Sequence, residues 1–372
     1  MKDVITRTIP FFDYKIFAKK YNQVLANTFQ DVINRGAFIL QKDLEDFENK
    51  IAGYLNVKHA IGVANCTDGL MLALRAVGIK EGDEVILPSH TFVATAAAVH
   101  FLGAIPVLVD CGRDHLMDPE VFEKAITKHT KAVMPVHLNG RTCDMDRIMS
   151  IANKHSLMVV EDAAQALGSR FKDKFAGTFG LVGAISFYPA KTLGCLGDAG
   201  IVITNDDEVA NKIFALHEHG RNKNGDMIGW GLNSRLDNLQ AAFLNIIFQD
   251  YELVIGRRRS IASLYQEQLR DIKELLLPPS SNSDTNHYDI YQNYEIQAED
   301  RDNLQTYLKS FGIGTLRQWG GAAVHQHKCL GFNIKLPYTD KMMSKELLLP
   351  INMSIVDDGV IYVCDRIKQF YK

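Results

Sequence analysis

The sequence predicts an α/β fold in which a mainly parallel sheet is covered by helices on both faces. Five apolar runs of five or six residues alternate with amphipathic stretches between residues 59 and 161. Continuous apolar strands separated by helices are typical of a parallel sheet that is buried on both sides. A polar, Pro-rich segment at 278–286 follows, and the pattern after it changes to that of a smaller α+β unit.

The elements are predicted in chain order. The first 50 residues are expected to be helical and to form an arm or to join the small unit. Two later strands lie so close together in sequence that an antiparallel or irregular pairing is expected there. The expected strands of the sheet are 59–64, 84–88, 105–109, 131–136, 157–161, 183–187 and 199–204, and the helices among them are 68–78, 92–102, 118–128 and 144–155.

The second half of the chain begins with two predicted helices, 206–219 and 235–270. The second is too long for one ordinary helix and is expected to bend or break. The remaining predicted elements are a strand at 287–297, a helix at 301–311, a strand at 313–319 and a helix at 356–371. We therefore expect a large domain at 1–250, including a helical arm at 1–50, and a small C-terminal domain at 251–372.

Composition excludes several classes of function. The 372 residues carry a net charge of −3 and one basic run, Arg257–Arg259, which suits a solvated helix face better than nucleic acid. The six cysteines are scattered, and His325, His327 and Cys329 lack the second ligand group of a zinc site, so no metal is expected. No window approaches about 18 apolar residues and no leader is visible, so we expect no membrane contact and a cytoplasmic protein.

The first candidate functional segment follows strand 59–64. A strand-to-helix turn presents free backbone N–H groups to a phosphate, and Thr67 could add its hydroxyl. The alternative is that Thr67 or Asp68 only caps the helix.

The second and third candidates also follow predicted strands. The Asp162 carboxylate, at a buried strand end, needs a partner such as a protonated pyridine nitrogen, and Gln165 could reach a hydroxyl on the same ring. The alternatives are that Asp162 caps the next segment or pairs with an Arg. Lys191 follows strand 183–187, where partial desolvation would make its amine a nucleophile, and the alternative is a solvated lysine. The glycines at 194–200 match neither G-x-G-x-x-G nor a P-loop.

Together and in this order, the segments resemble the DegT/DnrJ/EryC1/StrS family of sugar aminotransferases. The strings that carry the resemblance are NCTDGLMLALRAVGI, GDEVILPSHTFVATAAAV, VEDAAQALGS, SFYPAKTLGCLGDAGIVITND and GLNSRLDNLQAAFL. The resemblance implies a fold-type I enzyme that depends on pyridoxal 5'-phosphate. It also implies L-glutamate as the amino donor and a nucleotide-linked keto-sugar as the acceptor, in glycan, O-antigen or antibiotic sugar biosynthesis.

The resemblance assigns roles to individual residues. Lys191 would form the Schiff base with the cofactor and later carry the proton, while Asp162 and Gln165 would contact the ring. Asn233 would reach the phosphate of a neighbouring subunit, which implies a homodimer with shared active sites. The remaining cofactor contacts are the aromatic Phe92 on the ring and the phosphate contacts Cys66, Thr67, Asp68 and Ser186.

The substrate contacts implied are weaker, because the chain departs from the family pattern around them. They are Tyr188, Arg235, Trp319 and His325. Asn139 and Arg141 also stand where relatives commonly carry other residues. Arg141 would either meet an anionic group of a substrate or, as we favour, pair with Asp144 or Asp146.

Three alternative functions are considered. The first is a sugar dehydratase, against which Lys191 argues. The others are a non-catalytic regulatory protein on the same fold and a plain nucleotide-binding protein.

Overall fold

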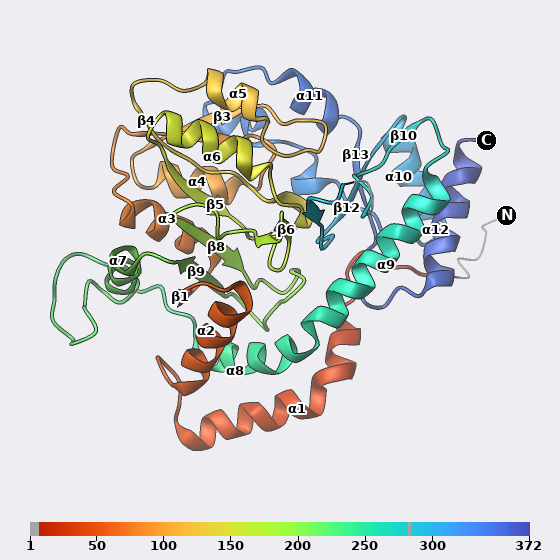
Figure 1. Ribbon diagram of the computed structural model, residues 1–372. Helices are drawn as coiled ribbons and strands as arrows, with labels where there is room; N and C mark the ends of the chain where they lie inside the picture. Colours follow the sequence, from red (N-terminus) through yellow and green to blue (C-terminus); the bar gives the residue numbers. More distant parts are fainter. Residues whose placement is uncertain (1–6, 282–283) are drawn as a thin grey trace.

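A seven-stranded sheet forms the centre of the molecule (Figure 1). The structure is a computed structural model that describes residues 7–281 and 284–372. Strand order is β1-β9-β8-β5-β4-β2-β3; β9 is antiparallel to both of its neighbours and the other pairs are parallel. The predicted mainly parallel sheet and its antiparallel section are therefore confirmed. The strands are β1 (His59–Val63), β2 (Glu84–Pro88), β3 (Ile105–Val109), β4 (Thr130–Val133), β5 (Met158–Asp162), β8 (Val182–Ser186) and β9 (Gly200–Thr204).

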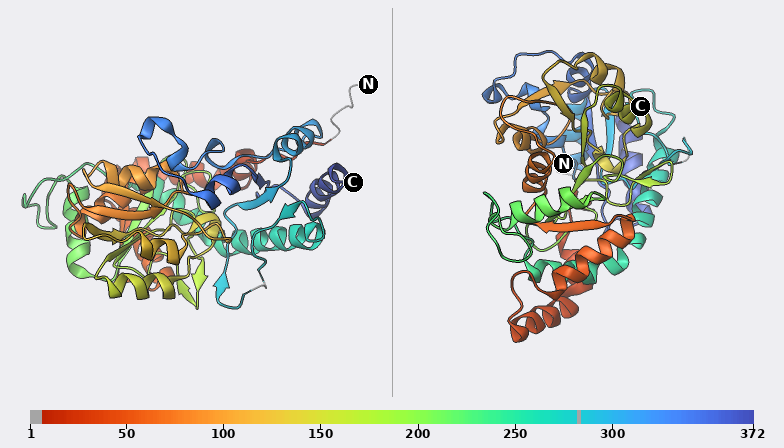
Figure 2. Two further views of the ribbon diagram at one scale, coloured as in Figure 1. Left: turned by 90° about the horizontal axis from the view of Figure 1, so that it is seen from above. Right: turned by 60° about the vertical axis from the view of Figure 1, so that its left-hand side comes forward.

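Helices cover both faces of this sheet (Figure 2). Alternate residues of one strand face opposite layers, so that Val159 and Val160 of β5 belong to different core clusters. One layer consists of α3 (Cys66–Ala76), α4 (Val93–His100) and α7 (Asp207–His217). The other consists of α2 (Lys42–Leu55), α5 (Pro119–Lys124), α6 (Met145–Lys154) and α8 (Asn238–Ile247).

A smaller sheet, of order β10-β12-β13, packs with three helices beside the large one. The predicted break in the long helix is confirmed, because the 3-10 turn η2 (Phe248–Asp250) separates α8 from α9. The start of α9 packs in the core of the large sheet and its end packs in that of the small sheet. The elements are α9 (Tyr251–Leu269), α10 (Arg301–Ser310), α12 (Asp357–Phe370), β10 (Leu275–Leu276), β12 (Tyr294–Ala298) and β13 (Glu346–Leu349).

Two strand predictions in this region are wrong. Residues 313–319 make only isolated bridges, to Ile9 and Leu348, because the apolar run ELLL of β13 takes the place beside β12. The predicted strand 287–297 is split by a loop in which Tyr291 has a φ of 51°. Its first part, β11 (His287–Tyr288), pairs instead with a hairpin made of β6 (Arg170–Phe171) and β7 (Lys174–Phe175).

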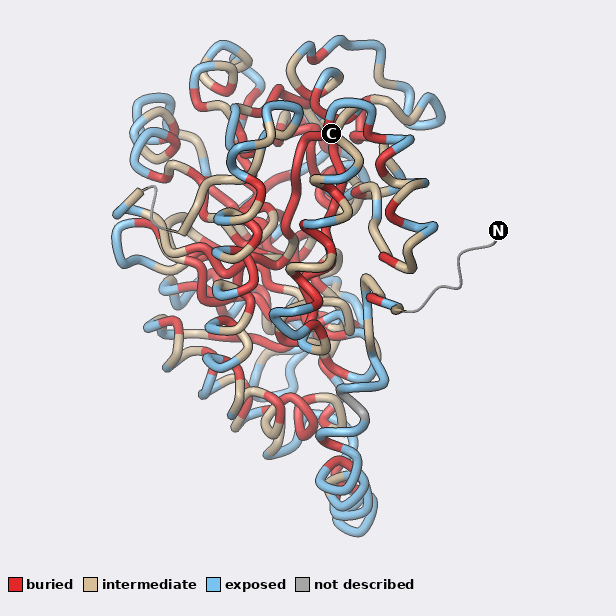
Figure 3. The backbone as a smooth tube through the Cα atoms, turned by 90° about the vertical axis from the view of Figure 1, so that its right-hand side faces the viewer, coloured by how far each residue is buried: buried red, intermediate tan, exposed pale blue. Residues whose placement is uncertain are grey.

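The N-terminal region is divided between the two parts of the structure. Ile9 pairs with Ile313 beside the small sheet, whereas α1 (Tyr14–Arg35) packs on α8 and remains exposed along most of its length (Figure 3). Residues 1–6 of the predicted arm, and residues 282–283 of the predicted linker, lie outside the described residues. The domain boundary at 250/251 stays a prediction. Among the described helices, none is long and apolar enough to cross a membrane.

The remaining elements lie in the chain between β12 and the C-terminal helix, apart from one turn after β4. They are η1 (Leu138–Gly140), η3 (Gln318–Gly320), η4 (Val324–Gln326), η5 (Lys328–Leu330) and α11 (Pro337–Met343).

Candidate active site

A cavity of about 570 Å³ opens at the carboxyl ends of β5 and β8. Ligands of open α/β sheets bind at this edge, where the strand order is interrupted by crossovers. The cavity brings together nine of the residues that the sequence singled out: Cys66, Thr67, Phe92, Asp162, Gln165, Ser186, Tyr188, Lys191 and Trp319.

Lys191 lies on the loop that follows β8. Burial of its amine lowers the pKa, and the nearby Cys66 and Asp162 oppose this shift only in part. Gln292 holds the backbone on both sides of the lysine: its Nε2 donates to the carbonyl of Ala190 at 2.8 Å, and its Oε1 accepts from the N–H of Thr192 at 2.8 Å. Lys191 is therefore partly desolvated, as predicted, and firmly positioned.

Asp162, the last residue of β5, is 4% exposed. Its carboxylate accepts from Thr95 Oγ1 at 2.8 Å and from the N–H of Ala164 at 3.1 Å. Burial raises the pKa of Asp162, and these two hydrogen bonds and the Lys191 charge act against it. No arginine pairs with Asp162 among the described residues, so the alternative of an Arg pair is wrong.

Glu161, the residue before Asp162, holds the end of β5 in place through hydrogen bonds to neighbouring loops. Its carboxylate accepts from His137 Nε2 at 2.7 Å and from the N–H of Gly177 at 2.8 Å. Because His137 Nδ1 accepts from the N–H of Cys143, Nε2 is the nitrogen that carries the proton.

The start of α3 forms the third wall. Asn65 is the N-cap, since its Oδ1 accepts from the N–H of Asp68 at 2.9 Å, so the prediction that Thr67 or Asp68 caps the helix is wrong. The Asp68 carboxylate turns to Ser234 Oγ, 2.8 Å away, and does not line the cavity. Thr67 and the positive end of α3 face the cavity instead, which suits a phosphate group. A Cβ on Gly200 would lie 2.7 Å from the Cys66 nitrogen, so β9 needs glycine where it meets this turn.

Aromatic side chains make up much of the remaining surface. Phe92 and Tyr188 are each about half exposed, and Trp319, Phe11 and Phe12 line the cavity with them. Trp319 has a φ of 50°, and its ring packs edge-on against His90 with 5.0 Å between the centroids.

Besides Asp68, three predicted site residues lie outside this cavity. Asn233 and Arg235 line a separate solvent-facing hollow of about 440 Å³, where Arg235 pairs with Glu218 at 2.9 Å. His325 is buried, with Nδ1 2.7 Å from Ser89 Oγ and Nε2 3.0 Å from Asp340. The roles predicted for them stay predictions.

Arg141 is paired within the chain, as favoured, but with other partners than predicted. Its guanidinium lies 2.6 Å from Asp289 and 3.6 Å from Asp284. Asp144 is instead the N-cap of α6, and Asp146 pairs with Lys172.

The sequence did not single out several residues that line or support the cavity. These residues follow β11 or lie in η3, far along the chain from the predicted strand ends. They are Gln292, Asn293, Glu295 and Gln318. No local pattern marks these residues. Asn139 was noted only as a departure from the family, and its N–H donates to Gln165 Oε1 at 2.8 Å.

The cavity thus combines an amine of lowered pKa, a buried carboxylate, a helix N-terminus and exposed rings. Together these groups fit a phosphorylated pyridine aldehyde: an amine for the aldehyde, an anion for the ring nitrogen, N–H groups for the phosphate and an aromatic face for the ring.

Comparison with known proteins agrees with this geometry. Residues 20–368 match the DegT/DnrJ/EryC1/StrS aminotransferase family. A dTDP-3-amino-3,4,6-trideoxy-α-D-glucose transaminase of Streptomyces venezuelae is 36% identical over 98% of this chain and 97% of its own length. A UDP-2-acetamido-2-deoxy-3-oxo-D-glucuronate aminotransferase of Pseudomonas aeruginosa is 35% identical, covering 96% of this chain and 98% of its own.

A solved structure supplies the cofactor class. The crystal structure of NtdA from Bacillus subtilis with bound PMP is 30% identical, covers 98% of this chain and 87% of that chain, and superimposes with a TM-score of 0.87. The fold is accordingly that of the fold-type I aminotransferases, and the enzyme depends on pyridoxal phosphate. The chain belongs to the DegT/DnrJ/EryC1/StrS aminotransferase family.

Proposed function

We propose that this enzyme transfers an amino group from L-glutamate to a keto-sugar carried on a nucleotide. The observation that carries the proposal is the meeting of Lys191, Asp162 and the α3 N-terminus in one cavity of about 570 Å³. That volume suits a cofactor together with a sugar, and the aromatic and amide lining suits a ligand with apolar and hydroxyl-bearing faces. The two relatives named above, which by name act on sugars linked to dTDP and UDP, support the nucleotide.

Each residue then has a defined task. Pyridoxal phosphate, when bound, supplies an electron-withdrawing ring that stabilises negative charge at the carbon from which a proton leaves. Lys191 holds the cofactor and, once released, takes and returns that proton at Nζ, for which its lowered pKa favours the neutral amine. Asp162 accepts hydrogen bonds from Thr95 and Ala164 that favour its anion against burial, and that anion would keep a ring nitrogen protonated.

The absorption spectrum tests the donor half of the reaction. Protein loaded with pyridoxal phosphate should show a near-visible band that is lost, in favour of a shorter-wavelength band, when L-glutamate is added. Lys191→Ala protein should still bind the cofactor weakly. After L-glutamate is added, its spectrum should change far more slowly than that of the wild-type protein, or not at all. Wild-type protein whose spectrum does not respond to L-glutamate, but does respond to another amino acid, would refute the choice of donor.

We further propose that the active unit is a homodimer with shared sites. Large apolar side chains are exposed on α1 and on the loop before Asn233, among them Phe29, Ile33 and Trp230, the last of which is 89% exposed. Exposed patches of this kind are typical of interfaces. Asn233 lies outside its own chain's cavity, as a residue that serves the neighbouring subunit must.

Mixing two inactive variants tests the shared site. Lys191→Ala and Asn233→Ala place their defects in different chains of a mixed dimer, so that one of its two sites carries no substitution. The mixture should recover about a quarter of wild-type activity, since about half of random dimers are mixed and each has one intact site. A mixture that stays inactive after subunit exchange would contradict a shared site. The cytoplasmic location also stays a prediction.

A further inference from the structure

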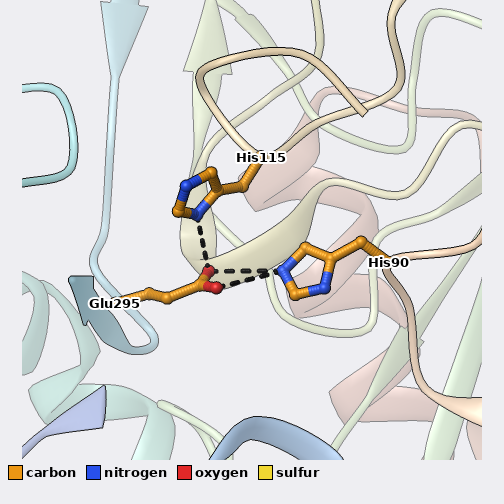
Figure 4. Close-up of side chains that lie close together, drawn as sticks. All are labelled: His90, His115 and Glu295. Carbon is orange, nitrogen blue, oxygen red and sulfur yellow. Dashed lines mark hydrogen bonds and ion pairs between the residues drawn. The ribbon is translucent and has the colours of Figure 1, made fainter. Parts of the chain in front are cut away.

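A buried carboxylate lies behind the cavity wall that η3 provides. Glu295, on β12, has a side chain that is 1% exposed, and its oxygens lie 3.1 Å from His90 Nε2 and 3.1 Å from His115 Nδ1 (Figure 4). His115 Nε2 accepts from Gln297 Nε2 at 2.8 Å, so Nδ1 carries the proton and donates to Glu295. The carboxylate is thus the acceptor of its neighbours' hydrogen bonds.

The surroundings keep this carboxylate ionised. Burial alone would raise the pKa of Glu295, but its contacts with His115 and His90 outweigh burial and hold the pKa below its ordinary value. The same contact raises the pKa of His115 against the effect of its own burial. An ionised carboxylate has no proton to donate, so every polar group that faces Glu295 must be a donor.

Asn139 is the next group in line. Its Nδ2 donates to Glu295, which turns its Oδ1 toward Asn293 Nδ2 at 2.8 Å and Gln318 Nε2 at 2.9 Å. Both of those side chains must therefore present their NH₂ groups to Asn139. Their carbonyl oxygens are left over, and both residues line the cavity.

The side-chain carbonyl oxygen of Gln318 is the last group in this series of hydrogen bonds. Gln318 is 3% exposed, and its Oε1 is buried without a hydrogen-bond partner among the described residues. Buried acceptors are normally satisfied, and because Gln318 lines the cavity, a shift of its amide would let a donor from a ligand supply the missing partner.

We propose that Gln318 Oε1 accepts a hydrogen bond from a hydroxyl of the sugar. At the position that meets Gln318, the enzyme then prefers a sugar with a hydroxyl over one with a carboxylate. The inference rests on the proposed function and narrows its substrate class. Glu295 fixes which way the side-chain amides of Asn139 and Gln318 face, so it is a positioning residue. A carboxylate would place acceptor against acceptor and leave the buried oxygen unpaired, which is a strong basis for rejection.

A metal ion is the other occupant that this cluster suggests. The ligand atoms of His90, His115 and Glu295 lie within 4.8 Å of one another, and two histidines with a glutamate form a known zinc set. A ligating histidine normally donates its other N–H to an acceptor. Here His115 Nε2 accepts a hydrogen bond instead, and His90 Nδ1 has no partner among the described residues. The hydrogen-bonded arrangement explains these contacts better.

The test compares matched ligands. Binding to the cofactor-loaded enzyme is measured calorimetrically for UDP- and dTDP-linked 3-amino- and 4-amino-hexoses and for the corresponding hexuronates, with the reverse half-reaction followed by absorbance. The hexose of the preferred pair should bind at least about tenfold more tightly than its uronate. Glu295→Gln should bring that ratio close to one, because an amide at 295 lets Asn139 turn over. Gln318→Leu, which deletes the acceptor, should do the same.

Glu346→Gln is the matched control. Glu346, on β13, accepts from the backbone N–H of Gln318 at 3.1 Å but does not touch its amide, so the ratio should be kept. A wild-type enzyme that binds the uronates equally well or better would overturn the proposal, as would a preference that survives both substitutions. One zinc ion per chain that Glu295→Gln removes would also overturn it. Failure of the L-glutamate half-reaction would instead count against the proposed function, since L-glutamate carries no sugar hydroxyl for Gln318 to meet.

Discussion

Replacing Gln292 by Leu would test how strongly the position of Lys191 depends on one distant side chain. Gln292 is 5% exposed and makes hydrogen bonds of 2.8 Å to the residues on either side of Lys191. Leucine has a similar volume but neither polar group. Two lost hydrogen bonds correspond to about 1–3 kcal/mol of unfolding free energy. Since unfolding entropy is about 2.1 cal/mol/K per residue, this predicts a fall in Tm of only about 1–4 °C for 372 residues.

The effect on catalysis should be larger than the effect on stability. A shift of about 1 Å in a reacting group reduces the rate on the order of 10²-fold, and Lys191 must meet both the cofactor and the substrate carbon. We expect the L-glutamate half-reaction, followed by stopped-flow absorbance, to slow by at least about tenfold. Gln268→Leu, which removes one contact of Lys368 away from the cavity, serves as a control for the loss of an amide elsewhere. A Gln292→Leu enzyme with the wild-type rate and a lowered Tm would show that the two hydrogen bonds of Gln292 serve stability alone.

Three further predictions concern the cofactor floor, a buried acid and the subunit interface. Thr95→Val removes a hydrogen bond to the Asp162 carboxylate, so the pKa of Asp162 should rise further and pyridoxal phosphate should bind at least roughly tenfold more weakly in a fluorescence titration; unchanged affinity would show that this hydrogen bond is dispensable. Burial and the nearby Glu295 raise the pKa of Glu346 from 4.5 to about 8, so between these pH values the folded chain holds a proton that the unfolded chain has lost. The unfolding free energy should therefore fall as pH rises through this window, by at most about 1.4 kcal/mol per unit, and urea titrations of Glu346→Gln should show a flatter profile; equal slopes in the two proteins would contradict the raised pKa. Trp230→Asp places a charge on the exposed apolar loop and should shift the protein toward monomer in sedimentation velocity runs; an unchanged dimer would place the interface elsewhere.

The large sheet was predictable because its strands are buried on both faces. Such strands consist of continuous apolar residues, as in EVILP and IPVLV, and this pattern is visible without knowledge of the partners. The strands of the small sheet were less predictable. Residues 313–319 and 346–349 are both apolar enough for a strand, and only packing against β12 decides between them.

The candidate site divides in the same way. Asp162 is the last residue of β5 and Lys191 lies in the loop after β8, so the predicted strand ends located both residues, and the family resemblance gave them their roles. Gln292 and Gln318 reach the cavity from more than 100 residues along the chain, through contacts that no local pattern encodes. Their function depends on hydrogen-bond direction, which requires the positions of all the neighbouring groups.

The most direct test of the central claim is to locate the covalent attachment of the cofactor. Wild-type protein loaded with pyridoxal phosphate would be reduced with borohydride, digested and sequenced by mass spectrometry. We predict a single modified lysine, Lys191, whose amine lies in the cavity with a lowered pKa. Modification at another lysine, or none in protein that binds the cofactor, would contradict the assignment of this cavity as the active site.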